Sequence, residues 1–460
     1  MKNTYQLADI NHVFFIGIAG VGMSAIAQYL CGIGKQVSGS DRYFVPTNDN
    51  DIKQKLTQEG ITCYSQNGEG ITKDIDVIVI STAIESTVPD MQIATQLNIP
   101  IIMRSDMLAI IAESKRTVAI GGTSGKSTTG GMLYQILFAA GLSPSIISGA
   151  GLVSIIKQGK IGNAIVGNGD WLIIEADESD GSITKYHADI GLLLNVDKDH
   201  QEITELLQLF LQFKNNTTRT FIVNQSNPLS ATLSTNIAHD FAVGDKPAGY
   251  IASQYNQTDM SSTFCINDVP FYLNSIGKHN MENALAAVAV ASQIGVSLQQ
   301  AAIGIAQYEG IYRRHQLIGQ KKGIIVIDDY AHNPAKCAAS ILACQPLAPK
   351  VIAWFQPHGY APTRFLKNDF IKEIAATLRE ADEIWMSEIF YAGGSAQKDI
   401  SANDLIEGIK ALGKNAYFVP DRNSLLATIS SHFTPDCVFL LMGARDPSLE
   451  TFGKQIFEQL

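Results

Sequence analysis

Short apolar runs alternate along the chain with longer segments in which apolar residues recur at helical spacing. The runs lie at 13–18, 77–81, 117–121, 171–175, 190–196, 324–328, 351–355, 383–387 and 438–442. Short apolar strands separated by helix-length segments are typical of βαβ units, which build parallel sheets covered by helices on both faces. We therefore predict an α/β protein made of largely parallel, doubly wound sheets.

The strand pattern restarts twice and predicts three domains. Residues 1–114 are expected to form a Rossmann-like domain, residues 115–311 a central P-loop domain, and residues 312–460 a second Rossmann-like domain. The stretch 224–272 is rich in Asn, Ser, Thr and Pro. Such a composition favours turns, so we expect short strands and loops there, at the edge of the middle domain.

Composition narrows the functional classes. The chain has 460 residues, of which 46% are hydrophobic and 17% charged, and its net charge is -10. An acidic protein of this kind is poorly suited to broad nucleic-acid binding, which needs clustered Lys and Arg. Its six cysteines form no CxxC pair, so neither a zinc site nor a redox motif is indicated. No signal peptide or long apolar segment is evident, and we expect a cytoplasmic monomer or homodimer with no membrane partner.

The first apolar run leads into a turn rich in glycine. It reads Gly17-Ile-Ala19-Gly20-Val-Gly22, and Asp41 closes the next strand. Glycines let a diphosphate approach the backbone at a helix N-terminus, where free N–H groups lie. The spacing differs from G-x-G-x-x-G because residue 19 is alanine. We predict nucleotide or diphosphate binding here; a nicotinamide-dependent oxidoreductase is an alternative that Ala19 and the separate P-loop disfavour.

The strongest local signal is a second glycine loop, after the run 117–121. It reads Gly122-Thr123-Ser124-Gly125-Lys126-Ser127-Thr128. The N–H groups of such a loop surround phosphates, Lys126 would reach the β- and γ-phosphates, and Ser127 or Thr128 would hold Mg²⁺. The standard spacing G-x-x-x-x-G-K would place the first glycine at residue 120, but the chain has Ile120 and then Gly121. Gly121 or Gly122 must therefore form the turn. The sequence predicts an ATP site with Lys126 as a catalytic residue.

Carboxylates crowd the ends of the next two strands. The run 171–175 ends in Glu175, Asp177, Glu178 and Asp180, and the run 190–196 is followed by Asp199 and His200. Clustered carboxylates repel one another unless a cation lies among them. Mg²⁺ prefers a few oxygen ligands together with substrate phosphates. We predict that Ser127, Glu175 and His200 hold the metal, and we expect some of the other acids to cap helices.

With these three motifs in this order, the chain resembles the Mur ligases of peptidoglycan assembly over essentially its whole length. It is nearest to their alanine-adding and murein-tripeptide-recycling branches. Further motifs carry the resemblance: Val37-Ser-Gly-Ser-Asp41, Ser81-Thr-Ala-Ile84, Gly277-Lys-His-Asn-Met-Glu-Asn283, Arg313-Arg314, Asp328-Asp-Tyr-Ala-His-Asn-Pro334 and Phe355-Gln-Pro-His358.

The resemblance implies a set of binding residues. For a UDP-linked substrate they are Gly17, Ala19, Gly20, Gly22, Met23, Ser24, Ser40, Asp41, Ser81 and Ala83. For ATP they are the P-loop residues 122–128 with His279, Asn280, Asn283, Arg314 and Asp329. For the incoming amino acid they are Tyr330, His332, His358, Arg364 and Arg445, and the implied catalytic residues are Lys126, His200, His358 and Arg364.

The chain departs from the alanine-adding members where the amino acid would bind. Gly359 and Pro362 stand where those members usually carry arginines, and only Arg364 of that cluster remains. Arg445 stands within a motif that usually reads Gly-Ala-Gly-Asp. Loss of two guanidinium groups removes bidentate carboxylate recognition, which glycine and proline cannot replace. An acceptor other than L-alanine is therefore expected.

Together these features predict an ATP-dependent, amide-forming ligase that acts through an acyl-phosphate and uses ATP and Mg²⁺. It would join a UDP-N-acetylmuramate-type carboxylate to an amino acid or peptide amine, in peptidoglycan synthesis or recycling. Two alternatives stay open: a ligase of another pathway with a carboxylate that carries no UDP, and a nucleotide-binding paralogue without activity.

Overall fold

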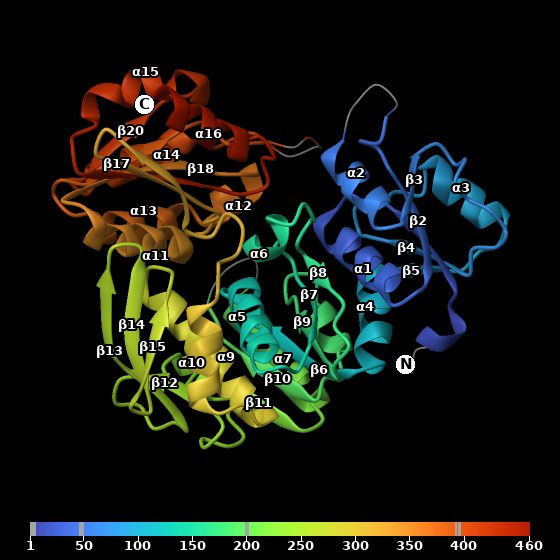
Figure 1. The fold of residues 1–460 in the computed structure, drawn as a ribbon. Helices are drawn as coiled ribbons and strands as arrows, with labels where there is room; N and C mark the ends of the chain where they lie inside the picture. The colour runs from blue at the N-terminus through green and yellow to red at the C-terminus, as the bar shows by residue number, and fades with distance from the viewer. Residues whose placement is uncertain (1–5, 46–49, 198–201, 392, 394–396) are drawn as a thin grey trace. The chain divides into compact units, whose positions relative to one another are not determined.

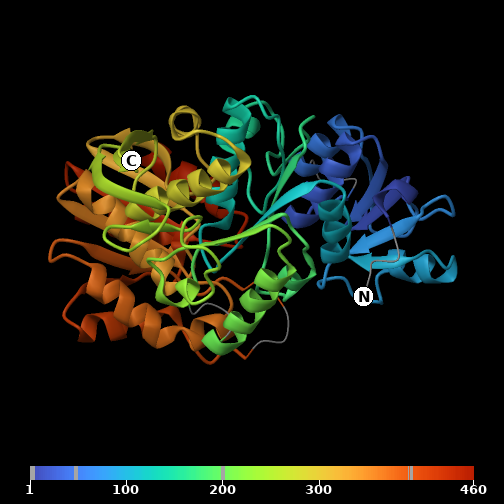
Figure 2. The ribbon, with the colours of Figure 1, turned by 90° about the horizontal axis from the view of Figure 1, so that it is seen from below.

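The computed structural model describes residues 6–45, 50–197, 202–391, 393 and 397–460. His200, predicted to hold the metal, and its neighbour Asp199 lie outside these residues. Internal contacts divide the chain into two compact units (Figures 1 and 2). The first unit comprises Met1–Ser253, Ile266–Val269 and Glu282–Ile311, and the second comprises Gln254–Cys265, Pro270–Met281 and Tyr312–Leu460.

The first unit opens with a five-stranded parallel sheet in the order β3-β2-β1-β4-β5. Its central strand is buried at every residue, as its apolar sequence requires. The strands are β1 (His12–Ile16), β2 (Gln36–Asp41), β3 (Thr62–Ser65), β4 (Val77–Ile80) and β5 (Ile101–Met103). The helices are α1 (Val21–Gly32), α2 (Asp51–Gln58), α3 (Pro89–Gln96) and α4 (Arg104–Glu113).

A second sheet of the first unit carries the P-loop. Its order is β11-β10-β6-β9-β7-β8, with β8 antiparallel to β7. The strands are β6 (Arg116–Gly121), β7 (Ser145–Ile147), β8 (Ala164–Ile165), β9 (Trp171–Glu175), β10 (Ile190–Leu193) and β11 (Thr220–Val223). Its helices are α5 (Lys126–Ala139), α6 (Val153–Ile156), α7 (Ile203–Asn216), α8 (Pro228–Ala231) and α10 (Leu298–Ala306). The apolar strand β6 lies between two parallel neighbours, which is the position that its burial demands.

The stretch 224–272, predicted as short strands and loops, contributes to a separate four-stranded sheet. Its order is β12-β13-β14-β15. The strands are β12 (Phe241–Val243), β13 (Tyr250–Thr258), β14 (Ser261–Ile266) and β15 (Val269–Leu273), and α9 (Lys278–Ile294) follows. Buried positions alternate with more exposed ones along β14 and β15. Serine and threonine in β14 and Pro270 in β15 are residue types that also occur in loops, so the composition of these strands resembles that of a loop.

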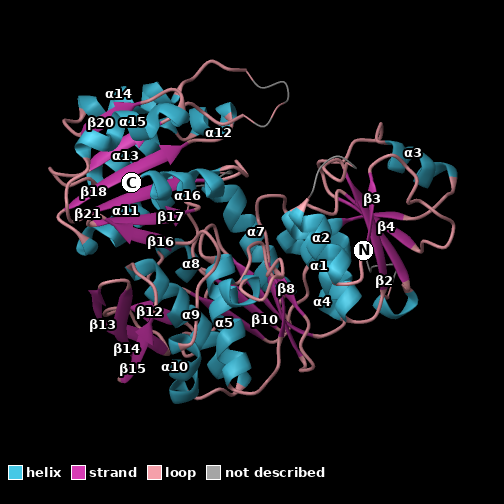
Figure 3. Ribbon diagram, turned by 45° about the horizontal axis from the view of Figure 1, so that its top comes forward, coloured by secondary structure: helices cyan, strands magenta, loops and turns pink. Residues whose placement is uncertain are grey.

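The second unit contains a six-stranded sheet in the order β16-β17-β21-β18-β19-β20, antiparallel only at β16. Separate apolar clusters cover its two faces, one with α11, α13 and α14 and one with α15 and α16 (Figure 3). The strands are β16 (Gln316–Lys321), β17 (Ile324–Asp329), β18 (Lys350–Gln356), β19 (Glu383–Met386), β20 (Asn415–Phe418) and β21 (Cys437–Gly443). The helices are α11 (Pro334–Cys344), α12 (Tyr360–Phe365), α13 (Lys367–Thr377), α14 (Ala402–Ala411), α15 (Leu425–Ile429) and α16 (Leu449–Gln459).

These elements confirm the predicted fold class and each of the nine strands predicted from apolar runs, with ends that differ by up to three residues. Short 3-10 turns add Leu7–Asp9, Ser182–Lys185, Gln345–Leu347, Arg422–Ser424 and Ser430–His432. Within the described part of the chain, every helix is too short or too polar to cross a membrane.

Candidate active site

The first glycine turn is shaped by backbone and carboxylate contacts. Gly17 has a φ of +84°, a value that favours glycine, and its N–H donates to the Ser40 carbonyl at 2.7 Å. Asp41 is buried, and its carboxylate accepts hydrogen bonds from the N–H groups of Ala19 and Tyr43, both at 3.0 Å. In this structure Asp41 therefore holds the turn itself. Its contact with a UDP-linked substrate stays a prediction.

An arginine that the sequence did not reveal lies against this turn. A Cβ placed on Gly22 would come within 3.1 Å of Arg104 Cδ and 3.3 Å of its Nη1. Arg104 follows β5 directly, and its Nη2 lies 3.2 Å from Asp180 Oδ2 in the acidic loop of the P-loop sheet. The signal in the sequence was a basic residue directly after a parallel strand, at the sheet edge where ligands of α/β proteins bind.

The other residues predicted to contact a UDP-linked substrate separate into two groups. Met23 and Ser24 are buried on α1, and Ser24 Oγ accepts a hydrogen bond from Asn163 Nδ2 at 3.1 Å. Their side chains therefore pack inside the unit. Ser81 and Ala83 lie in the turn after β4, where Ser81 is half-buried and Ala83 exposed.

The P-loop is held in shape by Asn195, which follows β10. The amide Oδ1 of Asn195 accepts from Thr123 Oγ1 and from the N–H of Ser124, both at 2.9 Å, and its Nδ2 donates to the Ser124 carbonyl at 3.2 Å. Gly125 caps α5 with a φ of +88°, and a Cβ there would lie 2.3 Å from Asn283 Oδ1. Glycine is therefore required at this position, and the first turn of α5 offers N–H groups to an anion.

Lys126, the first residue of α5, points back over the loop. Its Nζ donates to the Gly122 carbonyl at 2.6 Å and to Glu178 Oε2 at 2.7 Å. Burial lowers the pKa of Lys126, but the carboxylates of Glu178 and Asp177 outweigh burial and raise it. Burial also raises the pKa of Glu178, against the opposing effect of Lys126. The Lys126 ammonium therefore stays charged, whereas burial disfavours the charged form of Glu178.

Glu175 ends β9 beside the strand that delivers the P-loop, since Ile120 of β6 pairs with it in the sheet. Its Oε1 accepts from Ser148 Oγ at 2.8 Å and from the Gly149 N–H at 2.6 Å. A carboxylate and the Ser127 hydroxyl are hard oxygen donors of the kind that Mg²⁺ uses with phosphates and water. Among the described residues, no three His, Cys, Asp or Glu side chains converge in a geometry that could hold a metal ion.

The residues predicted to hold adenine divide between the two units. Thr129 Oγ1 of α5 donates to Asn283 Oδ1 at 3.3 Å, so Asn283 lies with the P-loop in the first unit. Asn280 is buried, and its Nδ2 donates to the Ser275 hydroxyl at 2.9 Å and the Ile276 carbonyl at 2.8 Å. His279 packs against His315, with ring centroids 5.1 Å apart.

A buried charged cluster lies at the carboxyl end of β17 in the second unit. Arg313 forms two hydrogen bonds with Asp328, at 2.8 and 3.1 Å, and donates to the Gly443 carbonyl at 3.1 Å. The guanidinium of Arg314 lies 4.8 Å from the ring centroid of Tyr330, in cation–π geometry. Burial raises the pKa of Asp329, but His315 and Arg314 outweigh it and keep this pKa below its ordinary value.

Two of the residues predicted to bind the amino acid lie together at this edge. The rings of His332 and His358 are 5.6 Å apart, and His332 Nδ1 donates to the Tyr330 carbonyl at 2.9 Å. Burial, followed by the charge of Lys336, lowers the pKa of His332 well below its ordinary value, so the ring is neutral at pH 7. Neutral imidazoles can accept a proton from an incoming amine.

The two predicted arginines of this group are engaged differently. Arg364 forms an ion pair with Asp399 and donates to the Gln397 carbonyl, on an exposed face. Arg445 is exposed, has a φ of +62°, and donates its backbone N–H to the Tyr330 hydroxyl at 3.3 Å. The structure therefore brings Arg445 to Tyr330 and directs Arg364 to Asp399.

Sequence reasoning missed a second arginine, Arg422, which follows β20. It contacts Asp446 Oδ2 at 2.5 Å, Ser448 Oγ at 2.5 Å and Gln356 Oε1 at 3.2 Å. Arg422 follows β20, Asp446 and Ser448 follow β21, and Gln356 ends β18. These residues therefore lie on the edge that carries His358 and Arg445. Arg422 fixes Asp446, the residue after Arg445, and thereby helps to orient this loop.

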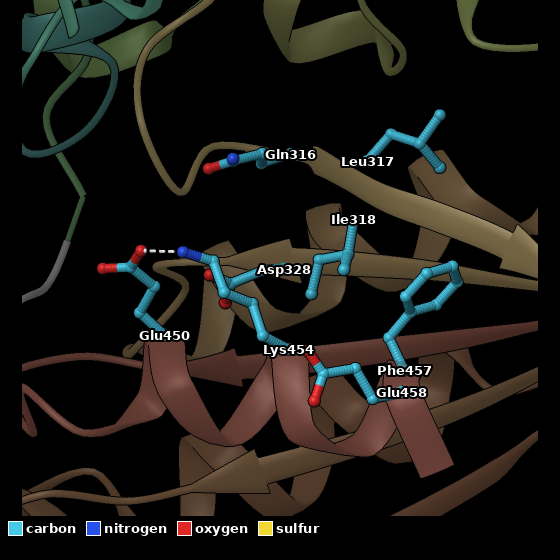
Figure 4. A pocket seen from close by; sticks show the side chains of 8 residues that line it. All are labelled: Gln316, Leu317, Ile318, Asp328, Glu450, Lys454, Phe457 and Glu458. Atoms are coloured by element: carbon cyan, nitrogen blue, oxygen red, sulfur yellow. Dashed lines mark hydrogen bonds and ion pairs between the residues drawn. The ribbon is translucent and has the colours of Figure 1, made fainter. Parts of the chain in front are cut away.

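A small pocket lies elsewhere in the second unit, between β16 and α16 (Figure 4). Its volume is about 230 Å³, and Lys454 pairs with Glu450 on its wall at 2.6 Å. Of the candidate active site it shares only Asp328, the partner of Arg313. The lining residues are Gln316, Leu317, Ile318, Asp328, Glu450, Lys454, Phe457 and Glu458.

The P-loop and the doubly wound sheets define a nucleotide-dependent α/β enzyme, and comparison with known proteins specifies the family. Residues 12–116 match the Mur ligase family, catalytic domain; residues 120–291 match the Mur ligase middle domain; and residues 313–445 match the Mur ligase, glutamate ligase domain. The chain belongs to the Mur ligase family. It is an ATP-dependent ligase that forms a carbon–nitrogen amide bond, as the sequence predicted.

Similar curated proteins cover nearly the whole chain. The UDP-N-acetylmuramate–L-alanine ligase of Acidithiobacillus ferrooxidans (strain ATCC 53993 / BNL-5-31) is 33% identical over 97% of this chain and 98% of its own length. The enzyme of the same name from Agrobacterium fabrum is 31% identical over 95% of this chain and 94% of its own. These likenesses confirm the resemblance seen in the sequence motifs.

Solved structures show the same fold. A UDP-N-acetylmuramate-alanine ligase from Thermotoga maritima has a TM-score of 0.77 and 24% identity, covering 97% of this chain and 98% of its own. A murein peptide ligase from Psychrobacter arcticus has a TM-score of 0.65 and 21% identity, with the same two coverages.

His279, the half-buried histidine at the start of α9, gives a prediction for stability against pH. Burial, followed by the charge of His315, lowers the pKa of His279 from 6.5 to about 3, although Asp329 opposes the shift. Between these values the unfolded chain binds a proton that the folded chain does not. His279 should therefore make the free energy of unfolding fall by about 1.4 kcal/mol per pH unit below pH 6.5. Urea unfolding followed by tryptophan fluorescence measures this slope, since Trp354 and Trp385 both lie in the second unit.

His279→Gln should lower the slope by that amount between pH 6.5 and 5, because glutamine does not titrate, while the contribution of His332 remains. His239→Gln is the matched control: it removes a histidine of the first unit, beside Asn236, and should keep the wild-type slope. An unchanged slope in His279→Gln would show that another group takes up the proton.

Proposed function

We propose that the enzyme joins the carboxylate of a UDP-N-acetylmuramate-type donor to the amine of an amino acid or peptide, in peptidoglycan synthesis or recycling. The single observation that carries this proposal is the arrangement at Lys126, where a P-loop lysine, Glu175 and the loop amide Asn195 meet at one sheet edge. The names of the similar proteins supply the substrate class.

The donor is proposed to bind at the first glycine turn. Its diphosphate would face the N-terminus of α1, where Gly20 caps the helix and backbone N–H groups are free of helical partners. The guanidinium of Arg104, which lies against Gly22, would add a charge-assisted contact. This contact supports a diphosphate over a neutral ligand at the turn.

ATP is proposed to bind on the P-loop, with its phosphates along residues 122–128 and its adenine near Asn283. Lys126 would contact the β- and γ-phosphates. A magnesium ion held by Ser127 and Glu175 would neutralise phosphate charge, and His200 is kept as a third proposed ligand although it lies outside the described residues. The oxygen donors of Ser127 and Glu175 fit this ion.

The proposed chemistry has two steps. A donor carboxylate oxygen attacks the γ-phosphorus, ADP leaves, and an acyl-phosphate forms. The amine nitrogen then attacks the carbonyl carbon, phosphate leaves, and the nitrogen gives up a proton to yield the amide. Lys126 offsets the charge that develops on the transferred phosphoryl group, and positioning with electrostatic stabilisation supplies most of the rate in such reactions.

The amine is proposed to bind at the carboxyl edge of the sheet in the second unit. His332 and His358 are the groups proposed to contact the amine, and Arg445, Arg364 and Tyr330 those that select its other end. An additional guanidinium at Arg445, combined with glycine and proline at positions 359 and 362, favours an acceptor whose anionic group differs in position from that of L-alanine. The proposed acceptors are therefore larger amino acids or peptides.

Phosphate release tests the first step. Purified enzyme with ATP, Mg²⁺ and UDP-N-acetylmuramate or its peptides should release phosphate only when an accepted amine is added from a panel of amino acids and peptides. Lys126→Ala should lower this rate by at least about a hundredfold, because the developing phosphoryl charge loses its ammonium. Lys157→Ala is the control, since Lys157 pairs with Glu309 on an exposed surface and should keep the wild-type rate.

The remaining arms of the assay separate the alternatives. Phosphate release with free murein peptides or other carboxylates, but not with UDP-linked ones, would show that the enzyme uses a different carboxylate donor. Nucleotide binding without turnover on any combination would favour a non-catalytic paralogue.

Arg104→Ala tests the donor site. We expect the KM for the UDP-linked donor to rise about tenfold or more, because one charge-assisted contact to phosphate is lost, with a smaller change in kcat. Lys185→Ala is the matched control: it removes another cation that ties the two sheets of the first unit, through Asp106 at 2.5 Å, away from the glycine turn. Equal effects of the two variants would show that loosened packing, rather than a phosphate contact, raises the KM.

A further inference from the structure

The acidic segment after β9 contains several carboxylates, but one of them holds the P-loop lysine. Glu178 Oε2 lies 2.7 Å from Lys126 Nζ, and the side chains are 5% and 16% exposed, respectively. Asp180 of the same segment turns to Arg104 instead, and Glu175 bonds to Ser148 and Gly149. The sequence does not distinguish these acids, so the role of Glu178 comes from the geometry.

The lysine is already engaged by two protein oxygens. Its ammonium has three donors, and two of them are directed to the Gly122 carbonyl and to Glu178. A phosphate at the P-loop needs the same ammonium. A carboxylate next to a bound triphosphate would also repel it, since both are negative and little water separates buried groups.

We propose that Glu178 is an internal competitor of the nucleotide: it holds the Lys126 ammonium, and the phosphates must displace it in order to bind. This inference rests on the proposed function, in which Lys126 binds ATP. Displacement makes binding weaker than the loop alone would allow. By the same exchange, Glu178 reclaims the lysine when the nucleotide leaves, which favours release of ADP.

The segment that carries Glu178 is held by contacts that do not involve Lys126. The N–H of Ala176 donates to the Ile120 carbonyl at 2.9 Å, and that of Ile183 to the Asp177 carbonyl at 3.0 Å. Asp180 accepts from the N–H of Ser182 at 2.9 Å. Loss of the Glu178 charge should therefore leave the fold of the segment intact, and glutamine fits the same volume.

The burial of the pair makes the competition measurable. Truncating one member of a buried ion pair usually destabilises the other, because a buried charge is left without compensation. Here the charge left behind by Glu178→Gln is the ammonium, and a phosphate can neutralise it. The variant should therefore bind phosphates more tightly than the wild type.

The test is calorimetric titration of the full-length protein, with Mg²⁺, using the non-hydrolysable β,γ-imido analogue of ATP, ADP and adenosine. Glu178→Gln should bind the triphosphate analogue roughly three- to tenfold more tightly and adenosine with unchanged affinity, in keeping with roughly one lost competing contact. Asp180→Asn removes the same charge from the same segment without touching Lys126, and it should leave the triphosphate affinity within about twofold. In a Lys126→Met background, Glu178→Gln should have no effect.

The possible outcomes separate the two proposals. Weaker or unchanged triphosphate binding by Glu178→Gln would overturn the inference and make Glu178 a support for the lysine. Equal tightening by Glu178→Gln and Asp180→Asn would also overturn it, since bulk charge would then be the cause. If the wild type binds no nucleotide, or binds it as well after Lys126→Met, the proposed ATP site itself fails, whatever Glu178 does.

Discussion

The parallel register of three strands in the first unit is the constraint on which the ATP site depends. Ile120 of β6 pairs with Glu175 of β9, and Gly121 pairs with Leu193 of β10. Because parallel strands end at the same edge, this register gathers the P-loop, the acidic segment and Asn195 from positions far apart in the chain. A shift by one residue would turn every side chain of a strand to the opposite face and separate these groups.

Apolar periodicity and glycine chemistry carried most of the information about the fold. Strands such as β6 and β9 are buried on both faces, so their continuous apolar runs are visible in the sequence. The sheet of β12 to β15 was predicted only as short strands and loops, because Ser, Thr and Pro interrupt the apolar positions of β14 and β15. Similarity to the Mur ligases confirmed the class of enzyme, while the individual site residues and the domain boundaries stay predictions.

Local sequence could not show which charged groups would meet. Glu178 and Asp180 are two residues apart and equally acidic, yet one contacts Lys126 and the other Arg104. Which acid meets which cation depends on the path of the chain after β9 and on packing between two sheets. A short sequence motif does not specify either of these. The pairing of Arg364 with Asp399 was likewise not visible in its motif, and the contact of Arg364 with substrate stays a prediction.

The Asn195 side-chain amide, which bonds to residues 123 and 124, lowers the entropic cost of phosphate binding at this loop. Since Asn195 both donates and accepts, it fixes this stretch of backbone during folding, and a ligand need not order it again. An aspartate would have nearly the same shape but could not donate to the Ser124 carbonyl, and it would place a negative charge beside an anion. Asparagine suits this position because its side chain can both donate and accept hydrogen bonds and carries no charge. It therefore orders the loop without adding a charge next to the phosphates.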